Sequence, residues 1–278
     1  SGGVLDRSAA ASIDVVGQLL RFPQRMDLGE GWFVNVADGP ARPPAAQPWD
    51  VLHRWGRHLR DDDVTAQALA HRGEGPVPPV MPELGLGRVL AALADQHWRD
   101  AEGSGSRAPY PAHVWLPEVQ LMVARERAGD PSGLALAVKG GHNDEAHNHL
   151  DVGSYLVALD SAPVLIDLGQ PTYTALTFTE RRYEIWTMDS SWHNLPEIRG
   201  HGQGVGRQYA AGDVLERSGD ASSLELELAA AYPRVAELRS YRRRVTLDRA
   251  PGSVPVARIE DRWQLDPTGE LAKNADVV

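Results

Sequence analysis

A polar stretch between two apolar segments carries the residue types best suited to chemistry. Residues 142–149 contain three of the ten histidines, and three acidic residues lie within residues 144–151. If this stretch is extended, His147, His149 and Asp151 project to the same face, because alternate residues of a strand share a face. Two imidazoles on one face can bind one cation together, or one can bind it while the other transfers protons.

Two later residues are candidates to complete such a site. The apolar runs 155–159 and 164–168 predict a β-hairpin over a turn at 160–163, which brings Asp167 towards His149. His193 follows in a polar loop. Two imidazoles and one carboxylate suit zinc, with a fourth position left for water. The competing interpretation makes His147 a loop residue that forms hydrogen bonds and Asp167 the cap of a turn.

Other polar residues near this stretch are weaker candidates. Asn143 and Glu145 are placed to orient reacting groups, although Glu145 is equally explained as a solvated loop carboxylate. Arg182 and the run 242–244 are candidates for a basic patch that binds an acidic ligand, or for a solvated face of a strand. His201 lies in a glycine-rich loop from which it reaches a ligand if the loop is ordered.

Composition excludes several classes of function. The 278 residues carry a net charge of -10, which disfavours nucleic acid and anionic membrane as partners. There is no apolar run of 18 residues and so no expected membrane span. The absence of cysteine removes disulfides and thiolate metal sites. No signal peptide is visible after the opening Ser-Gly-Gly, which resembles a cut or a tag remnant, and a homo-oligomer is compatible with the sequence.

Residues 1–108 are predicted to be helical. Apolar residues recur at helical spacing in four segments, 8–20, 49–59, 62–70 and 84–98, which are separated by loops rich in proline and glycine. Short helices joined by long loops make a poor self-contained bundle. We therefore expect this half to be the end of a larger helical domain.

Residues 109–278 are predicted to form an antiparallel β-sandwich. A glycine- and serine-rich linker at 100–108 precedes them, and Leu224, Leu226 and Leu228 alternate with acidic residues as in a strand with one dry face. No obvious closing strand follows, so a shortened sandwich is expected. Most of the eight tryptophans fall in expected helices or strands and are predicted to lie in the core. The expected strands are 114–125, 134–139, 155–159, 164–168, 207–216, 223–229, 241–248 and 256–265.

Three motifs together resemble the heparinase II/III family of bacterial polysaccharide lyases. They are Gly-His-Asn-Asp-Glu-Ala-His-Asn-His-Leu-Asp-Val-Gly-Ser at 141–154, Ala-Pro-Val-Leu-Ile-Asp-Leu-Gly at 162–169 and Trp-His-Asn at 192–194. The resemblance is dense over residues 135–205. It implies an α+β, multidomain architecture in which the end of an (α/α) toroid is followed by an antiparallel β-sandwich, and it favours a periplasmic or secreted location.

The resemblance also implies roles for individual residues. His149, Asp167 and His193 match the zinc-binding positions of the family, where the metal mainly supports the site. His147 matches the catalytic histidine beside them. Tyr183 lies near a cleft tyrosine of some members. The family also draws a tyrosine from its toroid, and the first tyrosine of this sequence is Tyr110.

These residue types suit β-elimination on a polysaccharide that contains uronic acid, the expected ligand. The proton on C5 becomes acidic once the neighbouring carboxylate is neutralised, after which a base removes it and an acid protonates the leaving oxygen. Two other interpretations remain open. One is a zinc-dependent hydrolase that activates water, and the other is a non-catalytic sandwich that zinc stabilises and that only binds sugar.

Overall fold

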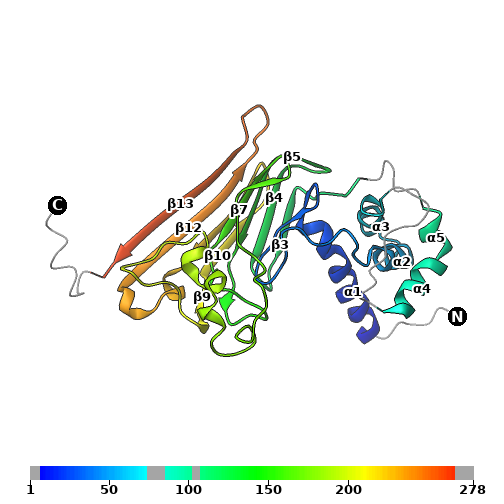
Figure 1. Ribbon diagram of the computed structural model, residues 1–278. Coiled ribbons are helices and arrows are strands. Elements are labelled where there is room, and N and C mark those ends of the chain that lie inside the picture. Colours follow the sequence, from blue (N-terminus) through cyan, green and yellow to red (C-terminus); the bar gives the residue numbers. More distant parts are fainter. Residues whose placement is uncertain (1–6, 74–84, 102–106, 267–278) are drawn as a thin grey trace. The chain divides into compact units, whose positions relative to one another are not determined.

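The computed structural model describes residues 7–73, 85–101 and 107–266 (Figure 1). The chain divides into two compact units. Residues 28–41 belong to the unit that contains the strands, and residues 109–111 and 128–130 to the unit that contains the helices. The first unit is formed by 1–27, 42–111 and 128–130, and the second by 28–41, 112–127 and 131–278.

The first unit contains the five helices α1 to α5. Asp61 caps α3 by accepting a hydrogen bond from the Val64 amide at 3.1 Å. The helix expected at 84–98 is two helices, because Asp95 leaves the helical conformation and caps the second. Residue 84, most of the loop at 73–82 and the centre of the expected linker lie outside the described residues. The bounds are Arg7–Met26, Trp49–Leu59, Asp62–Ala70, Leu86–Ala94 and Gln96–Arg99.

One sheet of the second unit has five strands in the order β3-β4-β5-β7-β8. The strand expected at 114–125 is a hairpin of two strands, because the chain reverses at 117–120 and Gln120 takes a left-handed conformation. The hairpin of β7 and β8 is confirmed, with a tight turn at Asp160 and Ser161. The bounds are His113–Leu116, Leu121–Arg127, Asp130–Lys139, Tyr155–Leu159 and Ala162–Leu165.

The other sheet is the antiparallel meander β10-β11-β12-β13. The strand expected at 207–216 is two strands, β9 and β10, because the chain leaves extended pairing at Ala211. β9, Gly206–Ala210, pairs instead with the short strand β6, His142–Asn143. The meander strands are Gly212–Arg217, Ala221–Glu227, Leu238–Asp248 and Val256–Leu265.

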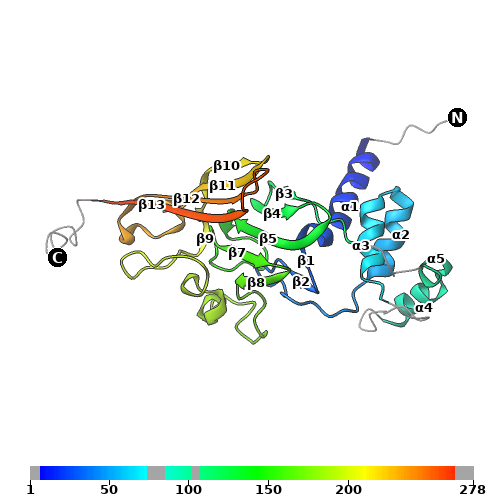
Figure 2. The same cartoon turned by 90° about the horizontal axis from the view of Figure 1, so that it is seen from above.

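The two sheets face one another across a shared core (Figure 2). Met122 and Leu136 come from the first sheet and Leu224, Val245 and Leu247 from the second, and each is completely buried. The predicted α+β class with an antiparallel sandwich is therefore observed. Among the described residues, no helix is both long and apolar enough to cross a bilayer.

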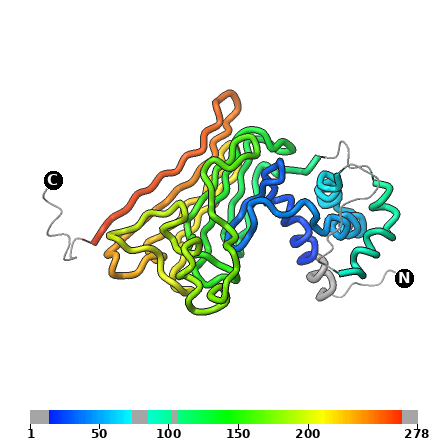
Figure 3. The backbone as a smooth tube through the Cα atoms, in the orientation of Figure 1, coloured from blue at the N-terminus to red at the C-terminus, as the bar shows by residue number. Residues whose placement is uncertain are grey.

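Two features of the fold differ from expectation. Four of the eight tryptophans are exposed, namely Trp55, Trp186, Trp192 and Trp263, so the prediction that most lie in the core is wrong for half of them. In addition, residues 28–41 run beside the strands (Figure 3) and include β1, Asp27–Gly29, and β2, Trp32–Phe33.

Candidate active site

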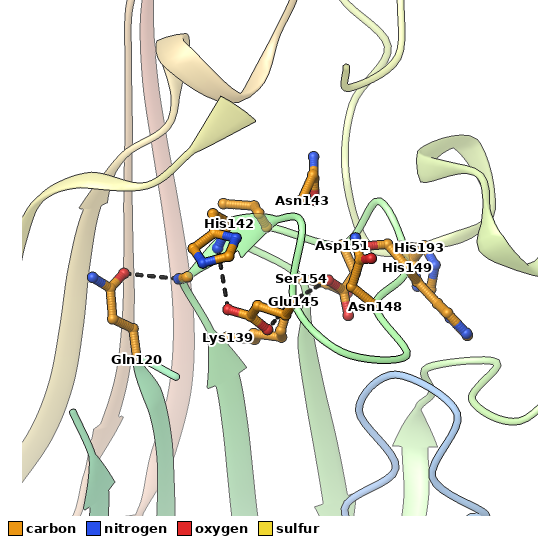
Figure 4. Close-up of polar contacts among 12 residues, drawn as sticks. Gln120, Lys139, His142, Asn143, Glu145, Asn148, His149, Asp151, Ser154 and His193 are labelled. Carbon is orange, nitrogen blue, oxygen red and sulfur yellow. Dashed lines mark hydrogen bonds and ion pairs between the residues drawn. The ribbon is translucent and has the colours of Figure 1, made fainter. Parts of the chain in front are cut away.

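The loop after β5 is shaped by hydrogen bonds to its own backbone (Figure 4). The Gly141 amide donates to Gln120 Oε1 at 2.8 Å, and the His142 amide donates to Glu145 Oε1 at 3.2 Å. Gly141 has a φ of 75°, and a Cβ there would overlap the Glu145 carboxylate. Glycine is therefore required at the point where the chain turns into the histidine-rich segment.

A buried lysine ties the two ends of this loop together. Lys139 Nζ lies 2.5 Å from Asp151 Oδ1 and 3.3 Å from Glu145 Oε2. Burial alone would lower the pKa of Lys139, but the two carboxylates outweigh it and raise the pKa above its ordinary value. The lysine is therefore charged, and its two ion pairs hold the loop against β5.

The three residues predicted to bind a metal lie close together at the base of the loop. One ligand atom from each of His149, Asp167 and His193 lies within 4.8 Å of the other two. His193 Nδ1 is 2.8 Å from Asp167 Oδ2, and the two imidazole rings are 5.4 Å apart between centroids. Both imidazole side chains have no exposed surface. Asp167 follows the hairpin β7–β8, because β8 ends at Leu165 and not at residue 168 as predicted.

Two buried nitrogens of this group are unsatisfied. His149 Nδ1 and His193 Nε2 have no hydrogen-bond partner among the described residues. A buried polar atom without a partner is costly, and its occurrence in a native site calls for a specific explanation. An imidazole nitrogen that bears a lone pair is also what a metal ion binds, so the donor set fits a cation such as zinc.

Burial and hydrogen bonding set the charges of the group. Burial lowers the pKa of His149, which favours the neutral ring that metal binding requires. Burial alone would raise the pKa of Asp167, but the hydrogen bond from His193 outweighs it and leaves the pKa below its ordinary value. Burial would lower the pKa of His193, yet the same hydrogen bond raises it overall. Asp167 therefore favours the protonated form of His193, and a cation bound at His193 Nε2 would have to displace that proton.

Asp38 connects His149 to His147. Its Oδ1 is 3.0 Å from His149 Nε2, and its Oδ2 is 2.8 Å from His147 Nδ1. Burial alone would raise the pKa of Asp38, but the hydrogen bonds from both histidines hold the pKa below its ordinary value. The His147 side chain is 55% exposed, and its Nε2 is left for a ligand.

One tyrosine and one arginine lie beside this carboxylate, and a second tyrosine binds Asn148 instead. The Tyr173 hydroxyl donates to Asp38 Oδ2 at 3.2 Å, whereas the predicted Tyr183 donates to Asn148 Oδ1 at 2.8 Å. Burial raises the pKa of Tyr183, although Asn148 and Arg182 oppose the shift. Arg182 Nη2 is 3.8 Å from Asp38 Oδ1, and both Nε and Nη2 are buried without hydrogen bonds. The two Arg182 donors are therefore candidates to bind an anionic group of a ligand.

The other predicted residues are not brought to Asp38. Asn143 is fully buried and donates to Gln203 Oε1 and the Gly204 carbonyl, at 3.1 and 3.0 Å. Glu145 forms its contacts with Lys139 and the loop backbone. His201 lies in a turn closed by two backbone hydrogen bonds with Ile198. The structure gives these three residues contacts that stabilise loops.

Three residues of the site were missed from the sequence. Asp38 is more than 100 positions from the histidines, and its Asp-Gly pair looks like an ordinary turn. Lys139 reads as the end of a strand, where a lysine is normally solvated. Of the three, only Tyr173 could have been found from the sequence, because it follows the predicted ligand Asp167 by six positions in the same loop.

No protein-family model and no curated protein matches the sequence. Solved structures do match the fold. The heparan sulfate lyase HepC from Pedobacter heparinus aligns with a TM-score of 0.58 at 12% identity, over 88% of this chain and 32% of that one. A heparinase III aligns with a TM-score of 0.54 at 13% identity, over 87% of this chain and 33% of that one.

A second heparinase III, with methylated lysines, gives a TM-score of 0.55 at 11% identity over 87% of this chain and 31% of that one. The chain therefore spans about a third of the length of these neighbours. At such identities the likeness establishes a shared fold, and any shared chemistry rests on the site described above.

Proposed function

We propose that this chain carries part of the active site of a polysaccharide lyase that cleaves a glycan containing uronic acid by β-elimination. One observation carries the proposal: Asp38 joins an exposed histidine, His147, to a buried His/Asp/His group. An exposed base held by a buried carboxylate is an arrangement suited to proton transfer. The fold shared with a heparan sulfate lyase and heparinase III supports the same reaction class.

The described residues supply the parts that β-elimination needs. Arg182 has two donors that form no hydrogen bond with a described residue, although Nη2 lies 3.8 Å from Asp38 Oδ1. In this proposal the guanidinium binds and neutralises the uronate carboxylate, which makes the C5 proton more acidic. His147 Nε2 removes that proton, because Asp38 fixes its other nitrogen. The C4–O bond then breaks as the C4–C5 double bond forms, and the leaving oxygen takes a proton.

A tyrosine hydroxyl is a suitable donor for that last proton, and the chain offers two. Tyr173 shares Asp38 with His147, whereas Tyr183 is bonded to Asn148 and is partly buried. Comparing Tyr173→Phe with Tyr183→Phe distinguishes them, because each change removes only a hydroxyl. The acid is the tyrosine whose loss lowers kcat by about 10²-fold or more, as expected for a general acid.

We further propose that His149, Asp167 and His193 hold zinc, as the unsatisfied histidine nitrogens favour. Bound zinc supplies a fixed positive charge that ties β7, β8 and the histidine loop together. Asp167 already orients the His193 ring, so it acts either as a ligand or as the carboxylate behind a ligand. Elemental analysis is expected to find about one zinc per chain, and none in His149→Ala.

The variant Asp167→Asn separates the two roles of Asp167. If the carboxylate is a ligand, zinc content falls as far as in His149→Ala. If it only orients His193, zinc affinity falls by about 10–100-fold and stoichiometric binding returns at higher zinc. If the folded wild-type protein binds no zinc at either the lower or the higher zinc concentration, the proposed metal site is contradicted.

The lyase reaction is tested on the whole natural protein with a panel of uronate polymers. The expected product has an unsaturated uronate end that absorbs ultraviolet light, so absorbance rises with time. New reducing ends without absorbance would indicate hydrolysis instead. Saturable binding with no cleavage of any polymer would favour the non-catalytic alternative.

A further inference from the structure

The inner face of β12 and β13 continues beyond the hydrophobic core. In the register of these strands, Tyr241 lies opposite Trp263 and Arg243 opposite Asp261. Because alternate residues share a face, Asp261 and Trp263 face the same side as the buried Tyr241. Trp263 is nevertheless 60% exposed. Figure 2 shows the end of β13 reaching past the strands of the other sheet.

A segment downstream of His193 makes this exposed face into a groove. Residues 196–199 lie beside it and are held by two contacts, the Tyr232 hydroxyl to the Pro196 carbonyl at 2.8 Å and an ion pair of Arg199 with Glu237. The groove has a volume of about 410 Å³, which is within the range of ligand-binding pockets. Tyr241, Asp261, Trp263 and Leu265 form its other wall.

The groove contains a polar atom that the protein leaves unsatisfied. The Tyr241 hydroxyl is buried and makes no hydrogen bond of normal geometry with any described residue, although the Asp261 carboxylate is near enough to influence it. Asp261 is held in place by Arg243, whose Nε and Nη2 donate to its two oxygens at 2.8 Å each. Arg243 is anchored in turn by the carbonyls of Gly153 and Asn194.

The charges of the groove favour an uncharged occupant. Asp261 is paired with Arg243, and Arg199 with Glu237, so both cations are already neutralised. An anion would lack a free cation among the described lining residues, and Glu197 would repel it. A purely apolar occupant would leave the Tyr241 hydroxyl unsatisfied and cover the carboxylate of Asp261. An occupant therefore needs both a flat apolar face and hydroxyl groups.

We propose that this groove binds a neutral sugar ring, separately from the His147 site. The apolar face of a pyranose packs on the indole of Trp263, and its hydroxyls bond with the Tyr241 hydroxyl and Asp261. The other exposed tryptophans lack this setting. Trp186 and Trp192 contact each other edge to face, and Trp55 packs against His58.

The test titrates the whole chain with cellotetraose, with a tetramer of N-acetylglucosamine and with a tetra-uronate, following tryptophan fluorescence and calorimetric heat. Saturable binding of one or both neutral tetramers is expected. Trp263→Ala weakens it by about tenfold or more, because the indole supplies most of the contact area. Trp55→Ala is the matched control and leaves the affinity unchanged.

Tyr241→Phe separates a ligand-binding hydroxyl from a structural one. Because the hydroxyl makes no hydrogen bond of normal geometry with any described residue, the thermal midpoint is expected to stay the same while affinity for the neutral sugar falls about three- to tenfold. A lower midpoint with unchanged affinity would overturn the proposal. So would the absence of neutral-sugar binding, binding of the uronate alone, or a Trp263 indole that iodide does not quench in the free protein.

The inference does not depend on the proposed lyase activity. His147→Ala leaves the groove intact and is expected to bind the neutral tetramer with wild-type affinity. Neutral-sugar binding by a protein without lyase activity would therefore support the groove proposal and count against the lyase proposal. Lyase activity without neutral-sugar binding would support the lyase proposal and count against the groove proposal.

Discussion

Each unit of the chain contains a histidine paired with a buried aspartate side chain, and the two pairs differ in what surrounds them. In the helical unit, His71 Nε2 is 2.7 Å from Asp27, Gln67 donates to the same carboxylate at 2.7 Å, and Trp49 stacks on the ring at 4.3 Å. In the sandwich, His193 Nδ1 is 2.8 Å from Asp167, and His193 Nε2 is buried without a partner among the described residues.

This difference shows that a histidine–aspartate pair is not by itself a site. The stacked indole and the amide of Gln67 are interactions of a packed interior. The sandwich pair faces a second imidazole, His149, which is unsatisfied in the same way. The proposed metal site therefore rests on two nearby unsatisfied nitrogens and not on the short contact between His193 and Asp167.

The largest expected effect is on catalysis. His147→Ala is expected to lower kcat/KM on a uronate polymer by about 10²–10⁴-fold, the usual contribution of a general base, while zinc content stays at wild type. His71→Ala is expected to lower the thermal midpoint and leave kcat of the folded protein unchanged. Equal losses of kcat in both variants would remove the distinction between the two regions.

A smaller effect is expected on stability, where the ion pairs of the two units are compared. Lys139→Met leaves the buried Asp151 and the partly buried Glu145 without their cation and is expected to cost about 3–5 kcal/mol in urea unfolding. Arg54→Met breaks pairs with Asp50 and Asp95 in which the arginine is 44% exposed, and is expected to cost less than about 1 kcal/mol. Similar costs would mean that Lys139 is not electrostatically essential to the loop.

Asp38→Asn is expected to act more weakly still, through His149. The change keeps the shape of the side chain but removes the charge that orients His149 Nε2. Zinc affinity is expected to fall about 10–100-fold, as for other residues that orient a metal ligand. A competition titration with a chelator measures the change, and Asp27→Asn in the helical unit is the control with no expected effect.

The sequence predicted elements well where a single periodicity governed them. α2, α3, β7 and β13 have the predicted bounds, because apolar spacing and turn residues agree there. The prediction of strands failed where a turn consists of residues that are uncommon in turns. The reversal at 117–120 ends in Gln120, and the break between β9 and β10 is at an alanine.

The residues of the candidate site likewise include some that the sequence predicted and some that it did not. His147, His149 and Asp167 were predicted from local spacing and one hairpin, and His193 from its polar loop and the family resemblance. Asp38 was not, because its approach depends on the path of residues 28–41, which is fixed by contacts such as the Asn35 amide with the Asp167 carbonyl at 2.9 Å. Contacts between segments more than 100 residues apart leave no periodic signal in one sequence.

The smallest expected effect concerns pH and belongs to the helical unit. Burial lowers the pKa of His53, and Arg57 adds to the shift although Asp95 opposes it. Its folded-state pKa therefore lies below the unfolded value of about 6.5. Since the unfolded chain then binds more protons, stability is complete above that value and declines as pH falls through it. Urea unfolding between about pH 7.5 and 5 measures the decline.

His53→Gln removes this titration while keeping a polar side chain beside Trp98, whose ring lies 5.4 Å from that of His53. Its stability is expected to change less with pH than that of the wild type over the same interval. An unchanged slope would assign the decline to other groups. His58→Gln is the matched control, because His58 is exposed on the same helix. A residual slope shared by both variants would then come from titratable groups other than His53 and His58, and subtracting it isolates the contribution of His53.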